Sequence, residues 1–463
     1  MWEGLERFAA MPGWLAALAD PARVEAALRE AVPGLRGALL GGVRLKRDSW
    51  TARAVLAVTG ADGAERTLEL AARIVPPGRG EPETTTPPAG LLGAEGWRCW
   101  LPELRLELSA DAEPVAKLPA LALLTDPERA RAFLETAIRA GAPAYQDLRI
   151  LGCSPRVMRH SPGSRCTILY RLTLPAESRA ATWPEVVVAK TYHRSDKGRI
   201  AWDGMQALWR SPLATSGVVA VAEPLAWVPE LNVLVQGPIR QEQTLKELLV
   251  DTLAGRDGQG EANSYLAKTA AGLAELHRSG APSAERATWE DELAEVRQVL
   301  GRLTGFLPEL DGAADPFLAD VERLAARVPA DPAVPAHRSF RPAQVLLHHG
   351  EIGFIDFDGF CHAEPALDVA LFRATVRDLG MGALPPAMPP DVRLVRLDEL
   401  CEAFLVGYEA LAPVSRERVA LWETLDLFTN VLHSWTKAKP ARLAHAVTLL
   451  SDHTASVEAL SRA

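Results

Sequence analysis

Side chains that could support phosphoryl transfer gather in one stretch of the sequence, AHRSFRPAQVLLHHGEIGFIDFDGF, residues 336–360. His337 and Ser339 begin an expected loop, Gln344 begins an expected strand, and a hairpin returns to Asp356. In phosphoryl transfer, one Asp accepts the proton of the acceptor hydroxyl, an Asn binds a second Mg²⁺ and a later Asp binds Mg²⁺. The spacing fits such a catalytic loop, because a loop followed by a hairpin can bring these groups around one γ-phosphate.

Two positions of this pattern hold unexpected residue types. Ser339 stands where the Asp is expected, and a serine hydroxyl cannot accept a proton at neutral pH as a carboxylate can. Losing a positioned base typically costs about 10²–10⁴ in rate, or about 3–5 kcal/mol of barrier. Gln344 stands where the Asn is expected. It keeps the amide oxygen but is one methylene longer, so it could still reach a metal ion.

Another acid could replace the missing base. Asp358 lies two residues past Asp356, so on a regular strand the two would share a face, although the chain is expected to turn there. This proximity makes Asp358 a candidate surrogate base, and an Asp358→Ala variant with intact turnover would exclude it. The catalytic candidates are thus Ser339, His337 and Asp358, and the candidate metal ligands are Asp356 and Gln344.

Residues that could bind nucleotide phosphates come earlier in the chain. Lys190 ends the apolar run VVVAK, where a strand would direct its ammonium group toward the α- and β-phosphates. The alternative is a surface Lys at the end of a buried strand, and a single Lys does not decide between the two. The preceding turn HSPGSR offers Ser161, Gly163 and Ser164, whose backbone N–H groups could bind phosphate oxygens, although it is not a G-x-G-x-x-G loop.

Two further segments have open interpretations. Residues 231–239, LNVLVQGPI, form an apolar strand that suits a hinge, with Val235 and Gln236 presenting backbone groups to an adenine edge. The same pattern fits any buried strand that leads into a turn. Asp203, in the helical segment GRIAWDGMQALW, is the candidate acid to pair with Lys190.

The elements that must position these residues follow from periodicity and turn residues. Strands are expected at residues 43–47, 52–58, 67–75, 156–159, 167–174, 186–192, 344–348 and 352–356. Helical patterns dominate from about residue 197, and DPERARAFLETAIRA is a helix with Asp126 at its N-cap. This order suits an α+β, bilobal, kinase-like fold, although the pattern alone also allows a generic α+β protein.

The motifs resemble a known family, the aminoglycoside phosphotransferase and choline kinase-like group. LAELHRSG, AHRSFRPAQVLL, IGFIDFDGF and EPALDVALF occur in the family's order, and RHSPGSRCTILYRL with VVVAK is similar to its small lobe. The resemblance implies a protein-kinase-like fold that binds ATP or GTP between its lobes, with Mg²⁺ at Asp356 and phosphate contact by Lys190. It also implies that His337 and Asp368 mainly brace the catalytic loop.

The resemblance covers about residues 150–450 and leaves residues 1–140 outside. Three parts are therefore expected: an N-terminal α+β accessory domain over residues 1–140, a small β-rich lobe over 150–240 and a helical large lobe over 241–463. The accessory domain has no chemistry that its sequence identifies.

Composition excludes several function classes. The chain has 463 residues and a net charge of −9, which argues against a general binder of nucleic acid or anionic membranes. Five scattered cysteines form no C-x-x-C pair, so buried, reduced thiols of a cytoplasmic protein are expected. The N-terminus has early acidic residues and no long apolar core, so neither a signal peptide nor a membrane span is expected.

Three functions fit these observations. The first is a nucleotide-binding pseudokinase or very weak kinase, because Lys190 and Asp356 are present while Ser339 replaces the base. The second is an active ATP-dependent phosphotransferase acting on a small hydroxylated metabolite or an antibiotic. The third is a peptide- or partner-binding scaffold in a biosynthetic complex. The acceptor and the oligomeric state are not readable from the sequence, and nucleotide binding without turnover would separate the first two.

Overall fold

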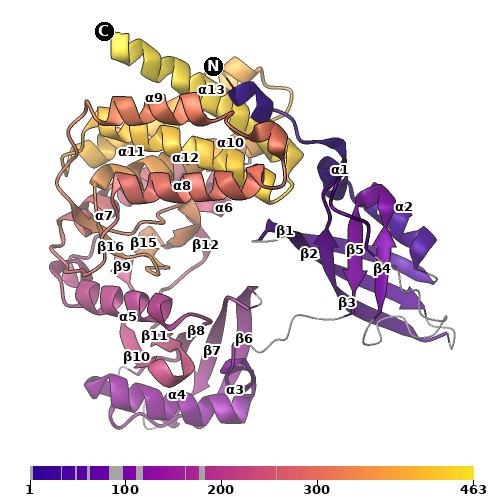
Figure 1. Cartoon of the computed structure of the whole chain (residues 1–463). Helices are drawn as coiled ribbons and strands as arrows, with labels where there is room; N and C mark the ends of the chain where they lie inside the picture. The colour runs from indigo at the N-terminus through magenta and orange to yellow at the C-terminus, as the bar shows by residue number, and fades with distance from the viewer. Residues whose placement is uncertain are drawn as a thin grey trace. The chain divides into compact units, whose positions relative to one another are not determined.

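The computed structural model describes residues 4–32, 34–46, 49–59, 63–82, 97–110, 118–161, 163–176, 183–256 and 258–462, with side chains to residue 455. These residues form a mixed α+β structure (Figure 1), and the chain divides into two compact units. The first unit comprises Met1–Pro114, Trp289–Val328 and Thr424–Ala463, and the second comprises Val115–Thr288 and Pro329–Glu423. All the candidate site residues belong to the second unit.

The first unit contains a five-stranded antiparallel sheet in the order β1-β2-β3-β5-β4. Its strands are β1 (Leu35–Leu45), β2 (Trp50–Thr59), β3 (Glu65–Ile74), β4 (Arg98–Leu101) and β5 (Leu106–Ser109). Its helices are α1 (Gly13–Ala16), α2 (Pro21–Ala31), α8 (Trp289–Thr304), α9 (Asp315–Ala325) and α13 (Pro440–Arg462). Trp50 packs edge-to-face on Phe306, and its Nε1 donates to the main-chain oxygen of Trp435 at 3.3 Å. Segments far apart in the sequence therefore share one core.

The second unit contains another five-stranded antiparallel sheet, in the order β10-β11-β8-β7-β6. Its strands are β6 (Gly152–Ser161), β7 (Arg165–Thr173), β8 (Val186–Tyr192), β10 (Pro224–Val228) and β11 (Val233–Gln236). Helices α3 (Leu121–Thr125) and α4 (Pro127–Gly141) pack on this sheet in one apolar cluster. The Asp126 carboxylate caps α4 by accepting the Arg129 N–H at 2.9 Å, as the sequence predicts.

The two faces of β8 have different neighbours, because successive side chains of a strand point to opposite faces. Val187 and Ala189 are fully buried in the cluster with α4. Tyr192 instead contacts α5 (Ser195–Trp209), where Gly198 approaches so closely that an added Cβ would lie 3.0 Å from the tyrosine ring. Figure 1 shows α4 and α5 on opposite sides of the sheet. Lys190 shares the face of Tyr192, away from α4.

A smaller sheet, in the order β12-β14-β15-β9, carries the hairpin expected after the catalytic loop. Its strands are β9 (Ala220–Val221), β12 (Gln243–Thr244), β14 (Val345–His348) and β15 (Glu351–Phe354). A separate pair joins β13 (Val334–Ala336) to β16 (Cys361–Ala363). The helices of this part are α6 (Leu245–Leu253), α7 (Gln259–Arg278), α10 (Pro365–Ala383) and α11 (Pro390–Glu409), and α12 (Arg416–Thr436) begins in this unit and continues into the first one from Thr424. The loop 337–344 thus runs from β13 to β14, and residues 355–360 connect β15 to β16.

The α+β fold class is confirmed, and a strand overlaps each predicted strand region, although β1 ends at Leu45 and β15 at Phe354. Residues 60–62, between β2 and β3, and residues 177–182, between β7 and β8, lie outside the described residues. The predicted domain boundaries stay predictions. Residues on both sides of the first boundary, from Leu118 to Ile150, pack in one cluster with the second sheet.

Two smaller expectations concern burial and membranes. Cys99, Cys166, Cys361 and Cys401 are buried, as expected, and Cys153 is half-buried. Among the helices of the described residues, none is long and apolar enough to cross a membrane.

Candidate active site

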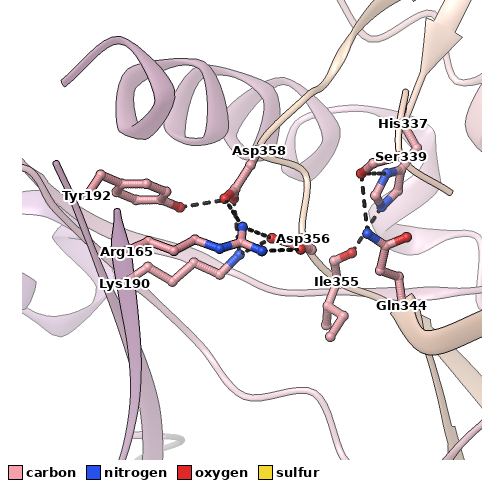
Figure 2. Close-up of polar contacts among 9 residues, drawn as sticks. All are labelled: Arg165, Lys190, Tyr192, His337, Ser339, Gln344, Ile355, Asp356 and Asp358. Atoms are coloured by element: carbon pink, nitrogen blue, oxygen red, sulfur yellow. Dashed lines mark hydrogen bonds and ion pairs between the residues drawn. The ribbon is translucent and has the colours of Figure 1, made fainter. Parts of the chain in front are cut away.

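Hydrogen bonds link His337, Ser339 and Gln344 in the loop that follows β13 (Figure 2). His337 is fully buried, and its Nε2 donates to the main-chain oxygen of Ile355 at 3.0 Å. In a neutral histidine this leaves Nδ1 as an acceptor, which lies 3.2 Å from Ser339 Oγ. Gln344 Nε2 donates to Ser339 Oγ at 3.3 Å. The Ser339 hydroxyl therefore donates its proton to His337 while its oxygen accepts from Gln344.

A buried carboxylate braces this loop from α10. Asp368 is fully buried, and its Oδ2 accepts the main-chain N–H of His337 at 2.6 Å. The same oxygen lies 3.3 Å from His277 Nε2, and His277 Nδ1 lies 2.6 Å from the hydroxyl of Tyr408. These contacts support the bracing role expected for Asp368, and they add His277 and Tyr408 to the loop's support.

We expect Asp368→Ala to lower the free energy of unfolding by about 1–3 kcal/mol, because it leaves the buried His337 N–H without its acceptor. Urea unfolding measures this loss. Asp368→Asn keeps an acceptor oxygen and should lose less. Equal stability of the Ala and Asn variants would contradict the bracing role.

Asp356 and Asp358 form an ion cluster with two basic side chains of the five-stranded sheet (Figure 2). Lys190 Nζ lies 3.0 Å from Asp356 Oδ1 and 3.1 Å from Asp358 Oδ1. Arg165 Nη1 lies 3.1 Å from Asp356 Oδ1 and 2.7 Å from Asp358 Oδ2. The Tyr192 hydroxyl donates to Asp358 Oδ1 at 3.0 Å. Two carboxylates thus meet two cations, and the cluster as a whole is neutral.

The charges hold one another ionised. Burial alone would raise the pKa of Asp356, but Lys190 and Arg165 outweigh it, and the pKa lies below its usual value. Burial alone would lower the pKa of Lys190, but Asp358 and Asp356 outweigh it, and the pKa is raised. Burial and then the negative charge of Asp358 raise the pKa of Tyr192, so its hydroxyl remains a donor.

The backbone around these groups is strained at two positions. Arg338 has a φ of 62° and Asp356 a φ of 76°, in the left-handed region that side-chain-bearing residues rarely adopt. Such conformations cluster at functional sites, where the surrounding structure holds them in place. At Asp356 this turn ends the extended chain after β15, so Asp358 does not continue the strand.

The oxygen atoms present fit a hard divalent cation. Gln344 Oε1 is buried and accepts no hydrogen bond from the described residues, so it is available as a ligand. The carboxylates of Asp356 and Asp358 are the other oxygen donors. The described part of the chain has no group of three or more His, Cys, Asp or Glu suited to a metal. The donor set therefore suits Mg²⁺, which is commonly held by one or two carboxylates together with phosphate oxygens.

The structure brings together most of the candidate residues but not all. Lys190 meets Asp356 and Asp358, whereas Asp203, the acid proposed to pair with it, bonds Arg199 at 2.8 Å on the exposed side of α5. That pairing was wrong, because an i,i+4 partner on the same helix is available to Asp203. Asp358 is not directed toward Ser339: Figure 2 shows it facing Tyr192 and Arg165.

The remaining candidates lie in the five-stranded sheet. Ser161, Gly163 and Ser164 belong to the turn between β6 and β7, and the Ser164 N–H donates to the Ser161 oxygen at 3.0 Å. Val235 and Gln236 lie within β11, opposite Ala189 and Val188 of β8. A buried strand is confirmed in this segment, whereas its role as a hinge and the contacts of all five candidates with a nucleotide stay predictions.

Arg165 and Tyr192 were not identified from the sequence. They lie directly opposite each other in the pairing of β7 with β8, one at the start and one at the end of a strand. The available signals were the position of Tyr192 two residues past Lys190, and that of Arg165 next to Ser164. The strand register, which the sequence does not specify, was needed to join them.

Comparison with known proteins gives a family match and a fold match. The profile described as "Phosphotransferase enzyme family" matches residues 205–445. A glucosamine kinase in complex with glucosamine, ADP and inorganic phosphate has 16% identity and a TM-score of 0.53, over 92% of this chain and 96% of that one. Another glucosamine kinase structure has 17% identity and a TM-score of 0.51, over 98% and 100% of the two chains.

A third solved structure, choline kinase LicA from Streptococcus pneumoniae, has 14% identity and a TM-score of 0.44, over 68% of this chain and 98% of that one. The search of curated proteins finds no match. At these identities the glucosamine kinase matches show the fold alone, and they confirm the expected kinase-like fold. Both matches cover more of this chain than residues 150–450, to which the motif resemblance was confined.

Proposed function

Because the chain belongs to the phosphotransferase enzyme family, we propose that it binds a nucleotide at Lys190 and Asp356 but transfers phosphate very weakly or not at all. This proposal rests on the hydrogen bonds of the Ser339 hydroxyl. Its hydroxyl proton is directed to His337 Nδ1, and its oxygen accepts from Gln344. Among the described residues, the hydrogen-bond partners of Ser339 are His337 and Gln344 and include no carboxylate, so a strong base is missing at this position.

The residues proposed to bind the nucleotide are present, although the loop lacks a carboxylate base. Lys190 and Arg165 supply positive charge for phosphate oxygens, and Arg165 has planar N–H groups suited to them. Asp356 and Gln344 are the proposed ligands of Mg²⁺, which when bound neutralises charge on the phosphates. Asp368, through the main chain of His337, holds the loop in position.

A second candidate function, a slow but active phosphotransferase, is favoured by the Ser339–His337 contact of 3.2 Å. In this case Ser339 Oγ would accept the acceptor's hydroxyl proton as it passes its own proton to His337 Nδ1. The substrate oxygen would then form a bond to the γ-phosphorus as the bond to the nucleotide's leaving oxygen breaks. The acceptor would be a small hydroxylated compound, the class to which glucosamine in the similar glucosamine kinase complex also belongs.

The experiment is a paired measurement of ATP binding and phosphate release on one preparation. Calorimetric titration with ATP, with and without Mg²⁺, should detect binding that Lys190→Gln weakens at least about tenfold through loss of a phosphate-facing charge. Lys197→Gln is the matched control, because Lys197 is exposed on α5 nearby. Thermal unfolding checks that both variants remain folded.

The outcomes separate the two candidates. Binding with phosphate release no higher than in a protein-free blank supports the pseudokinase. Release that disappears in Asp356→Ala supports the active enzyme. Absence of ATP binding to the wild-type chain would overturn both and leave a partner-binding scaffold.

A further inference from the structure

All four carboxylate oxygens of Asp356 and Asp358 are already engaged by donors of this chain. Arg165 reaches three of them: Asp356 Oδ1 at 3.1 Å, Asp356 Oδ2 at 3.4 Å and Asp358 Oδ2 at 2.7 Å. Lys190 and Tyr192 take Asp358 Oδ1 at 3.1 and 3.0 Å. Arg165 thus bridges both carboxylates at a position where a divalent cation would also need to contact them.

We propose that Arg165 is a built-in counter-cation that bridges Asp356 and Asp358 and must leave before a divalent metal ion can bind there. The proposal deepens the nucleotide site proposed above and rests on it for its biological role. The contacts that carry it are independent of any nucleotide.

The charge balance explains why the metal is excluded while Arg165 stays. Together, Lys190 and Arg165 carry two positive charges against the two negative charges of the aspartates. A further divalent cation would enter a neutral cluster, next to two positive groups that repel it. With Arg165 withdrawn, the two aspartates and Lys190 together carry one net negative charge, and Asp356 Oδ2 and Asp358 Oδ2 are freed, which makes a better site for a hard cation.

Of the two cations, Arg165 and Lys190, Arg165 is the one whose side chain can withdraw from the aspartates. Its side chain is 25% exposed, whereas that of Lys190 is 10% exposed. Arg165 is also the first residue of β7, directly after a turn in which Gly163 has a φ of 66°. Lys190 instead lies inside β8, paired to Thr167 on one side and Leu234 on the other. After withdrawal, the guanidinium can bind phosphate oxygens.

The test uses Mn²⁺ alone, without nucleotide, as the probe in a calorimetric titration. We expect Arg165→Gln to bind Mn²⁺ roughly tenfold more tightly than the wild-type chain, because one repelling charge is removed and carboxylate oxygens are freed. Arg171→Gln is the matched control, since Arg171 is exposed near the other end of the same strand. Its Mn²⁺ affinity should equal that of the wild type. Adding Asp356→Asn to Arg165→Gln should abolish the gain.

A second variant, Arg165→Lys, tests the same proposal if Arg165→Gln does not fold. It keeps the charge but loses the bridging geometry, so its Mn²⁺ affinity should lie between those of the wild type and Arg165→Gln. Equal Mn²⁺ affinity in the wild type and in a folded Arg165→Gln or Arg165→Lys variant would overturn the proposal. A gain in Arg165→Gln without any ATP binding by the wild type would support the counter-cation and overturn the nucleotide function.

Discussion

Replacing Ser339 with Asp is expected to raise the rate of ATP-dependent phosphoryl transfer by about 10²–10⁴-fold, the usual worth of a positioned base. The side chain at this position is already oriented by His337 Nδ1 at 3.2 Å and by the Gln344 amide at 3.3 Å. A carboxylate there can accept from the Gln344 amide and keep lone pairs for an acceptor hydroxyl or a water molecule. The rate is measured as ADP formation under saturating ATP and Mg²⁺.

Ser339→Asn is the matched control, because it has the shape of Asp without the charge or the basicity. It should leave the rate at the wild-type level. An equal rise in both variants would show that side-chain size, not the base, limits transfer. An Asp variant that binds ATP as the wild type does but gains no rate would show that more than the base is missing from this site.

Local patterns made much of the fold predictable. Apolar alternation located three strands of the first five-stranded sheet and four of the second, but it missed β4, β5 and β10, and the Asp126-Pro127 pair located the start of α4. These signals are local, because strand and helix periodicity and capping depend on residues close in the sequence. The loop 337–344 and the hairpin after it were predictable for the same reason.

Contacts between distant segments were not predictable from such patterns. The approach of Trp50 to Trp435 brings a strand of the N-terminal sheet into one unit with C-terminal residues, and no periodicity of either segment indicates it. In the site, Arg165 reaches Asp358 across 193 positions of sequence. The register of β7 with β8 and the left-handed turn at Asp356 decide that contact, and a strand prediction specifies neither.

The partners of Lys190 were mispredicted for the same reason. Asp203 was predicted from the sequence, whereas the structure places Asp356 and Asp358 beside Lys190. An acid on the next helix was a reasonable partner by proximity in sequence, but Arg199 lies one helical turn away and pairs with it. Lys190 is left to neutralise the aspartates of the hairpin. The charges of this site therefore balance within the chain, and this is the arrangement from which Arg165 must withdraw.

Replacing Glu423 with Ala is expected to lower the free energy of unfolding by about 3–5 kcal/mol, because it leaves buried positive charges without their carboxylate. Glu423 is fully buried and accepts from Arg373 Nε at 2.8 Å and from Arg377 Nε at 2.6 Å. Burial alone would lower the pKa of both arginines, but Glu423 outweighs it and raises the pKa of each. Both stay charged when Glu423 is removed, because an arginine side chain is not deprotonated in proteins, and among the described residues only Arg377 then keeps another carboxylate, that of Asp398.

The matched control is Glu409→Ala, which breaks an ion pair near the surface. Glu409 bonds Arg416 Nε at 2.7 Å, but the Arg416 side chain is 52% exposed, so water can solvate it and the loss should stay below about 1 kcal/mol. Urea unfolding compares the two variants. A combined Arg373→Met, Arg377→Met and Glu423→Leu variant should regain much of the stability, because desolvated charges are replaced by apolar groups of similar volume. A loss in Glu423→Ala as small as in Glu409→Ala would mean that water reaches the arginines, contradicting the buried network.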